Sequence, residues 1–211
     1  MSVFKNRIIF FGDSITDADR DYHAFDGSVE QLGHGYVRLV QSGLKSKFID
    51  RKYEVFNRGI NGHRTTDLLQ RIQKDVIDYK PEFVFIMIGI NDVWRNFDAH
   101  YHRIDQVSED DYAHNYEKIL SQLLDAGIQP VVASAFYLEP NKDEPMRKMT
   151  DAYNARVKAL ADKYNVEYID VQHEMDTFMV HNSSYVISWD RVHLNHVGAH
   201  YLANIYLNRF K

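Results

Sequence analysis

Short runs of apolar residues alternate along the chain with longer segments in which apolar residues recur at helical spacing. The runs are continuous rather than alternating, as in parallel strands that are covered on both faces. They predict strands at residues 7–11, 53–56, 83–88, 128–133 and 166–171. The helical spacing predicts helices at residues 36–48, 65–79, 112–126, 145–164 and 196–210.

Residues at the segment ends support these boundaries. Thr65 and Thr66 are expected to begin the second helix, because threonine side chains accept hydrogen bonds from the free N–H groups there. Asp67 would then lie in the first turn, where the helix dipole favours a negative charge. Gly127 is expected to end the third helix, since glycine readily takes the left-handed conformation found after a last helical turn.

The strand and helix rhythm predicts one parallel sheet of about five strands between two helical layers, joined by right-handed crossovers. Ligands of such sheets bind beyond the carboxyl ends of the strands. Ser14 and Asn91 follow the first and third predicted strands, so both are expected at that edge. No linker, repeat or low-complexity segment interrupts the pattern, so residues 1–211 are expected to form a single domain.

Composition narrows the function classes. Of the 211 residues 45% are hydrophobic, and the net charge of -5 comes from acids and bases mixed along the chain. This balance argues against a nucleic-acid or anionic-membrane partner. The longest apolar run, residues 83–90, is far too short to cross a membrane. Cysteine is absent, which excludes disulfides and thiolate chemistry, and we expect a cytoplasmic protein.

The first candidate for chemistry is Ser14, which follows Gly12 and Asp13 directly after the first predicted strand. A serine in this place can simply cap a helix. It can also be a nucleophile, because a helix start offers N–H groups and a positive dipole to a developing oxyanion. The position alone leaves both interpretations open.

The second candidate is the pair Asp190 and His193 near the end of the chain. A neutral imidazole is an effective base near neutral pH, and a carboxylate three residues earlier can orient it and stabilise its protonated form. Activity that needs a neutral imidazole should rise through an apparent pKa of about 6.5–7. The alternative is an ordinary surface pair, since the chain has 11 histidines.

Two further blocks lie after predicted strands. Asn91 stands in Gly-Ile-Asn-Asp, where its amide can donate to an oxyanion or simply form a turn. Residues 57–62 contain Gly59 and Gly62, which permit a close backbone approach or a positive φ, but which also suit a plain loop.

Taken in order, these four blocks resemble those of the SGNH (GDSL-like) hydrolase family, and the resemblance runs over residues 8–200. It implies a flavodoxin-like three-layer α/β/α sandwich. It also implies a catalytic triad of Ser14, His193 and Asp190 that works without a cofactor or metal.

The resemblance further implies an oxyanion hole made by the Ser14 N–H, the Gly62 N–H and the Asn91 side chain, with Gly59 as the alternative glycine donor. Two positions depart from the family pattern. Ile15 replaces the leucine of the older motif name. Leu194 replaces a proline that many members have, so the loop that holds the histidine is expected to be less rigid.

A closer likeness, to the intracellular acetylxylan esterase branch, is carried by residues 89–95, 136–139, 145–147 and 189–193. It implies removal of acetyl groups from sugar hydroxyls. Trp94 and Trp189 are the two tryptophans of the chain, and both lie beside catalytic blocks. We expect them to bind substrate, although large aromatic residues also pack beneath loops.

Other motifs are missing or incomplete. No Gly-x-Ser-x-Gly elbow or phosphate-binding P-loop occurs. Residues 33–35 (Gly-His-Gly) do not continue into a dinucleotide fingerprint. His100 and His102 could bind a metal, but Asp98 and Asp105 beside them favour a polar surface loop.

We therefore expect a serine esterase whose partner is a small-molecule ester, an acetylated sugar by the likeness above. A lysophospholipase or thioesterase with a longer acyl groove is the first alternative. A non-catalytic binding module that kept the fold is the second. The oligomeric state stays open, a homo-oligomer included.

Overall fold

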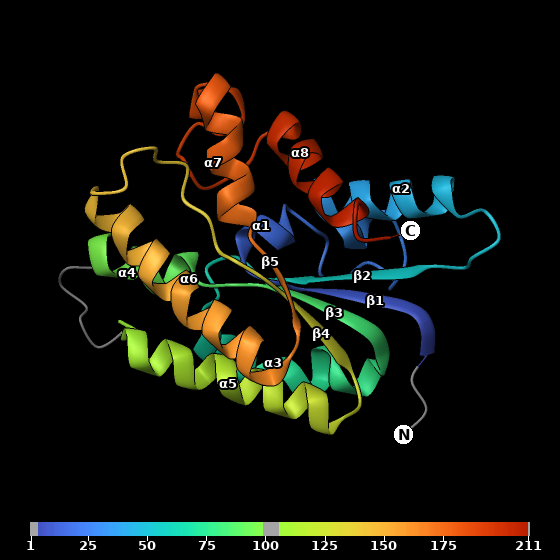
Figure 1. Ribbon diagram of the computed structural model, residues 1–211. Helices are drawn as coiled ribbons and strands as arrows, with labels where there is room; N and C mark the ends of the chain where they lie inside the picture. Colours follow the sequence, from blue (N-terminus) through green and yellow to red (C-terminus); the bar gives the residue numbers. More distant parts are fainter. Residues whose placement is uncertain (1–3, 99–105, 211) are drawn as a thin grey trace.

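A five-stranded parallel sheet forms the centre of the molecule, in the order β2-β1-β3-β4-β5 (Figure 1). The computed structural model describes residues 4–98 and 106–210. The strands are β1 (Phe4–Gly12), β2 (Glu54–Gly59), β3 (Pro81–Met87), β4 (Gln129–Ala133) and β5 (Glu167–Ile169).

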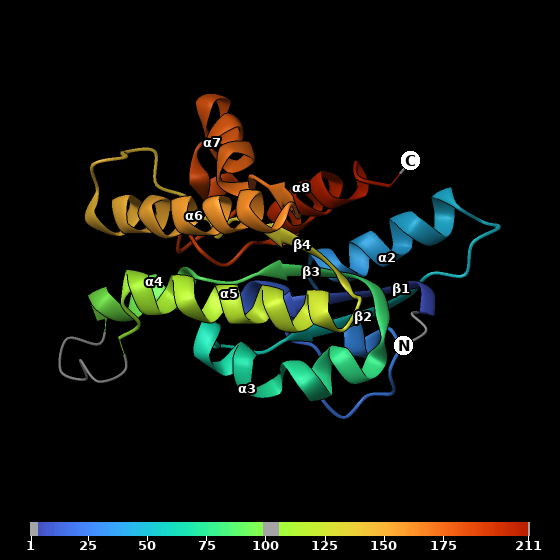
Figure 2. The same cartoon turned by 60° about the horizontal axis from the view of Figure 1, so that its bottom comes forward.

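Helices cover both faces of this sheet (Figures 1 and 2). One face carries α2 (Tyr36–Lys47) and α8 (His196–Leu207). The other carries α3 (Thr65–Asp75), α5 (Glu109–Asp125) and α6 (Pro145–Tyr164). The strand order reverses after β2, so right-handed crossovers send the helices to opposite faces. The prediction of a flavodoxin-like three-layer sandwich is confirmed.

Strand register brings the candidate blocks together. Gly12, the last residue of β1, lies opposite Gly59 on β2 and Met87 on β3. The segments that follow these three strands therefore leave the sheet at the same edge. Inside the sheet, residues 8–11 of β1 are at most 1% exposed, because helices pack on both faces. This explains the continuous apolar run of the sequence.

Three α-helices were not predicted from the sequence. They are α1 (Ser14–Asp17), a single turn, α4 (Ile90–Asp98), which begins in the Gly-Ile-Asn-Asp block, and α7 (Val171–His181). The fifth strand was predicted to reach residue 171. It ends at Ile169, because the Asp170 side chain accepts a hydrogen bond from the His173 N–H and so caps α7.

The predicted boundaries of α3 also need correction. The residue that caps its start is Arg64 rather than a threonine, and the Arg64 N–H donates to the Asp67 carboxylate at 2.8 Å. The helix ends at Asp75, and a short 3₁₀ helix covers Ile77–Tyr79. Two more 3₁₀ turns lie at Glu30–Leu32 and Ser184–Val186.

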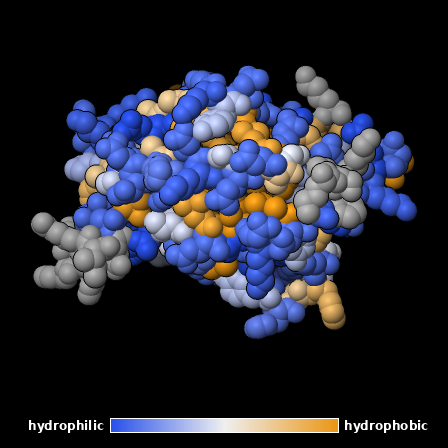
Figure 3. Space-filling model, turned by 90° about the horizontal axis from the view of Figure 1, so that it is seen from below, coloured by the Kyte–Doolittle hydropathy of each residue, from blue (hydrophilic) through white to orange (hydrophobic). Residues whose placement is uncertain are grey.

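The surface seen from below in Figure 3 is mostly hydrophilic, with apolar side chains showing between the polar ones near its centre. A helical layer that packs its apolar side on a sheet leaves such a polar outer face. Among the described residues, no helix has the length and apolar character needed to cross a membrane.

Candidate active site

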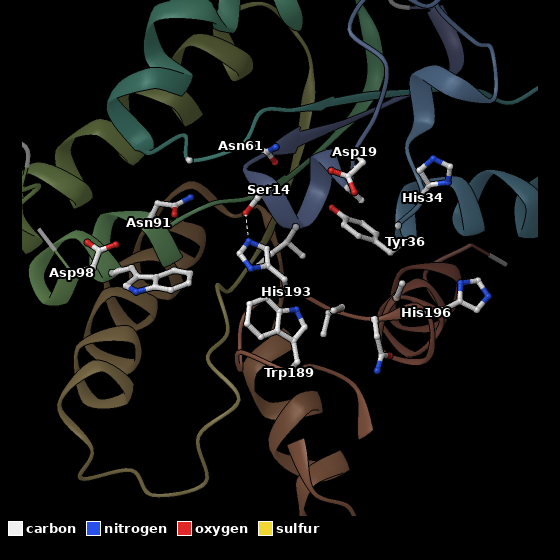
Figure 4. Close-up of a pocket in the computed structure, with 18 of the residues that line it drawn as sticks. Ser14, Asp19, His34, Tyr36, Asn61, Asn91, Asp98, Trp189, His193 and His196 are labelled. Carbon is white, nitrogen blue, oxygen red and sulfur yellow. Dashed lines mark hydrogen bonds between the residues drawn. The ribbon is translucent and has the colours of Figure 1, made fainter. Parts of the chain in front are cut away.

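Ser14, His193 and Asp190 form one continuous line of hydrogen bonds, of which Figure 4 shows the contact between Ser14 and His193. The Ser14 Oγ lies 2.9 Å from Nε2 of His193. The Nδ1 atom on the other side of the same ring lies 2.6 Å from Oδ2 of Asp190. The structure thus brings together the three residues that the sequence proposed, from opposite ends of the chain. In this arrangement a base can take a proton from a hydroxyl while a carboxylate stabilises the charge that results.

The end of β1 and the start of α1 set the position of Ser14. Asp13 caps the one-turn helix α1, since its Oδ1 accepts a hydrogen bond from the Ile15 N–H at 3.0 Å. The Ser14 side chain therefore begins a helical turn at the carboxyl edge of the sheet. Burial raises the pKa of the Asp13 carboxyl to about 7.

Asp190 is held by the loop that carries the imidazole. Its Oδ1 accepts hydrogen bonds from the Val192 N–H at 2.9 Å and from the His193 N–H at 2.7 Å. Burial opposes the charged form, but the hydrogen bond with the His193 ring and those two backbone N–H groups lower the pKa of Asp190. The carboxylate thus stays charged beside the ring.

Leu194, which stands where many family members have proline, lies in a hydrogen-bonded part of the loop. Leu194 pairs with Ser188 in an isolated antiparallel bridge. The Asn195 N–H donates to the Ile187 carbonyl at 2.8 Å. Backbone hydrogen bonds therefore join the two ends of this loop.

The two glycines of the second block have different surroundings. The Gly59 N–H donates to Oδ1 of Asn57 at 2.8 Å, and a Cβ on Gly59 would lie 2.1 Å from the Asp17 nitrogen. Gly59 thus serves the close packing of β2 on α1. Gly62 lines the pocket with a φ of +75°. Of the two, Gly62 is the one that lines the pocket.

Asn91 lies in the first turn of α4 and is 3% exposed. It lines the same pocket as Ser14 (Figure 4), and Gly62 lines this pocket too. The next residue, Asp92, is fully buried, and its carboxylate accepts hydrogen bonds from the N–H and the hydroxyl of Thr65. Asp92 therefore ties the start of α4 to the start of α3.

Sequence reasoning missed Asn57 as a residue that shapes this site. The Asn57 amide nitrogen lies within hydrogen-bond distance of three carbonyls, those of Thr16, Asp17 and Leu32. Its position directly after a predicted strand is the sequence feature that could have indicated this role. Its partners, however, become visible only when β2 is paired with β1.

Asp17 and Arg20 were missed as well. The Asp17 carboxylate accepts from the Asn61 N–H at 3.1 Å, and Arg20 Nε donates to the Gly59 carbonyl at 2.8 Å. These contacts fix residues 59–61 against α1. They therefore set where the following Gly62 lies.

The pocket over Ser14 has a volume of about 830 Å³. Trp94 and Trp189, the two tryptophans beside the candidate blocks, both line it. The Trp94 ring centre lies 6.0 Å from that of His193. Trp189 is 77% exposed, so its ring presents an open apolar face beside the imidazole (Figure 4).

The histidine cluster considered as a metal site falls mostly at residues 100–105, which lie outside the described residues. Asp98 is described, and it pairs with Arg95 at 2.5 Å. Across residues 4–98 and 106–210 no three histidine or carboxylate side chains gather as a metal site would need.

Comparisons with known proteins agree with this geometry. The profile of the GDSL-like Lipase/Acylhydrolase family matches residues 10–201. An acetylxylan esterase of Geobacillus stearothermophilus is 34% identical over 201 residues, which cover 95% of this chain and 92% of that protein.

Solved structures are also similar. Axe2, an acetylxylan esterase from Geobacillus stearothermophilus, superposes with a TM-score of 0.93 at 33% identity, over 98% of this chain and 94% of Axe2. LAE5, an alpha/beta hydrolase enzyme from the metagenome of Lake Arreo, Spain, superposes with a TM-score of 0.93 at 31% identity. The match covers 98% of this chain and 95% of LAE5. Structures of three catalytic mutants of Axe2 carry alanine in place of a serine, a histidine or an aspartate. The chain therefore belongs to the GDSL-like lipase/acylhydrolase family and is a carboxylic ester hydrolase, as its sequence blocks predicted.

Proposed function

We propose that the chain is a serine esterase in which Ser14 is the nucleophile, His193 the general base and Asp190 the residue that orients the base. The observation that carries this proposal is the hydrogen-bonded line from Ser14 Oγ through both ring nitrogens of His193 to Asp190. The catalytic mutants of Axe2 support it, because they affect the same three residue types.

The reaction proceeds through an acyl-enzyme. As Ser14 Oγ attacks the ester carbonyl, Nε2 of His193 takes the hydroxyl proton. The Ser14 N–H, the Gly62 N–H and the Asn91 amide donate to the oxyanion. His193 then gives its proton to the departing alcohol. In the second half it activates a water molecule, which releases the acid and restores the free serine.

The substrate we propose is a short-chain acyl ester of carbohydrate, an O-acetyl group above all. The similarity to acetylxylan esterases supports this choice. So does the pocket, because Trp94 lies close to the imidazole, where the acyl group must sit, and exposed Trp189 offers a flat surface on which a sugar ring can stack. The chain would act in the cytoplasm as a single domain on a small-molecule ester.

Active-site labelling combined with kinetics tests the triad. A fluorescent serine-directed phosphonate should label the wild-type chain and fail to label Ser14→Ala. Hydrolysis of p-nitrophenyl acetate should fall by about 10⁶-fold in Ser14→Ala and His193→Ala, as triad losses do elsewhere. Asp190→Asn should cost less, because the base remains present.

The same variants should keep the wild-type melting temperature within a few degrees, since the Ser14 and His193 side chains are partly exposed. Retention of a tenth of wild-type activity by folded Ser14→Ala would remove Ser14 as the nucleophile. An unlabelled and inactive wild-type chain would instead favour the binding-module alternative.

A further inference from the structure

The loop that carries the base contains a residue in an unfavourable backbone conformation. Arg191, between Asp190 and His193, has a φ of +69°. Side chains with a Cβ seldom adopt this left-handed region, so surrounding contacts must hold the residue there. The conformation coincides with the turn in which Asp190 Oδ1 accepts from two successive N–H groups, those of Val192 and His193.

Arg191 contacts the segment that follows β4 through both its backbone and its side chain. Its carbonyl accepts a hydrogen bond from the N–H of fully buried Leu138 at 2.9 Å. Its guanidinium forms an ion pair with Glu139, whose side chain is 10% exposed. Hydrogen bonding to the Tyr137 side chain and the charge of Glu139 raise the pKa of Arg191. Both the backbone and the side chain of Arg191 are thus held by one segment.

That segment is itself fixed to two helices by a buried arginine. The Glu139 carbonyl accepts a hydrogen bond from Nη1 of Arg147 on α6 at 2.6 Å. Arg147 is 2% exposed and pairs with both carboxylate oxygens of Asp176 on α7, at 2.8 and 2.6 Å. A continuous series of contacts, in which the Glu139 main-chain carbonyl joins two ion pairs, therefore runs from α6 and α7 to the loop that carries His193.

We propose that Arg191 and Glu139 are positioning residues for the general base. Their ion pair holds Arg191 in its left-handed conformation, and this conformation aims the His193 ring at Ser14. Neither residue is among those that line the pocket. They would therefore act on the rate of the chemical step and leave substrate binding unchanged. The proposal rests on the proposed function, since it assumes that His193 is the base.

The contacts that lead to Arg191 come from two segments that are distant from it in the sequence. Residues 136–139 and 145–147 lie far from the triad in the sequence. In the structure they supply Glu139 and Arg147, the two contacts that lead to Arg191. Misplacing a reacting group by about 1 Å can lower a rate by 10²-fold. A small rotation of this loop is therefore enough to affect turnover.

Steady-state kinetics of three variants test this. We expect Arg191→Ala and Glu139→Gln to lower kcat by about tenfold or more with KM within twofold of wild type, because only the base is displaced. Arg191→Lys, which keeps the charge, should recover part of the loss. The matched control is Arg209→Ala, since Arg209 pairs with Glu167 at 3.1 Å and is 39% exposed, close to the 41% of Arg191. This control should keep the wild-type kcat.

A spectroscopic measurement separates positioning from a general loss of stability. Proton NMR of the wild type should show a downfield resonance for the His193 Nδ1–H that faces Asp190. In Arg191→Ala this resonance should broaden or shift while the chain stays folded. A kcat within twofold of wild type in both Arg191→Ala and Glu139→Gln would overturn the proposal, as would an unchanged His193 resonance. If His193→Ala is inactive at the same time, the proposed triad survives that result.

Discussion

The side-chain amide of Asn91 donates a hydrogen bond to the main-chain carbonyl of His63 at 3.1 Å. The two residues follow different strands, so this contact joins the block after β3 to the glycine block after β2. An amide nitrogen carries two hydrogens, and the second one is left for the pocket that Asn91 lines. The contact therefore fixes the direction in which the free hydrogen points.

Asn91→Ala should lower kcat by roughly 10²–10³-fold with little change in KM, because an oxyanion donor acts mainly in the transition state. Steady-state kinetics with an acetyl ester measure both constants. Asn91→Asp serves as a second variant, since it keeps the size and replaces the donor by an acceptor. A large rise in KM at constant kcat would show instead that Asn91 binds the ground state.

Asn57→Ala should lower the free energy of unfolding by about 3 kcal/mol or more, since it leaves several buried hydrogen-bonding groups without a partner. Asn57 is fully buried and faces the carbonyls of Thr16, Asp17 and Leu32. Urea denaturation measures the change. The control is Asn182→Ala, because exposed Asn182 donates to one carbonyl, that of Phe178. Equal losses in the two variants would contradict this role of Asn57.

The layers of the fold could be predicted because the information is local, whereas the candidate triad followed from the resemblance of four blocks to a known family. Each apolar run is long enough to identify a buried strand. The blocks with Ser14, Gly62 and Asn91 follow β1, β2 and β3, whereas Asp190 and His193 come after α7. The helix at Pro145–Tyr164 was predicted with its observed bounds, since a proline at its first turn and a long apolar period mark it. The short helix α1 was not predicted, because four residues are too few to show a period.

The supporting residues could not be predicted for a different reason. Asn57, Asp17 and Glu139 act through partners that are distant in the sequence or through backbone groups of other elements. A pattern of apolar and polar positions does not encode such contacts. The choice between Gly59 and Gly62 likewise needed the structure, which shows that the Gly59 N–H already donates to Asn57.

The free energy of unfolding should depend on pH through the protonation of Asp92. Burial raises the pKa of this carboxyl from 3.8 to about 7. Between these values the folded chain keeps a proton that the unfolded chain has lost. The stabilisation is therefore complete below about pH 4 and is lost as the pH rises through 7. Relative to Asp92→Asn, the wild type should lose roughly 2–3 kcal/mol of unfolding free energy between pH 5 and pH 8.

Urea denaturation of both proteins at the two pH values measures this difference. The change between the two pH values is taken within each protein. Any pH-independent effect of the substitution on the free energy of unfolding therefore cancels. Asp13, whose pKa is raised in the same direction, is present in both proteins and cancels too. Parallel pH profiles for wild type and Asp92→Asn would show that Asp92 is charged in the folded chain.

The preference for short acyl groups is the sharpest test of the substrate proposal. The Trp94 ring centre lies 6.0 Å from that of His193, so a wall stands close to where the acyl group of the intermediate must lie. We expect kcat/KM to fall at least tenfold from acetyl to butyryl p-nitrophenyl esters, and further at octanoyl. Loss of one methylene of fit changes binding by about 1–3 kcal/mol in a hydrophobic pocket, and steric overlap discriminates more strongly.

Two substitutions separate the roles of the tryptophans in this preference. Trp94→Ala should flatten the acyl-length series, because it removes the wall beside the imidazole. Trp189→Ala should leave that series unchanged and raise KM for an acetylated xylo-oligosaccharide, because the exposed ring of Trp189 would no longer stack on the sugar. A wild-type enzyme that hydrolyses octanoyl esters faster than acetyl esters would point to a lipid-ester or thioester substrate instead. That result would leave Ser14, His193 and Asp190 in their proposed roles, since the acyl wall and the triad are separate parts of the pocket.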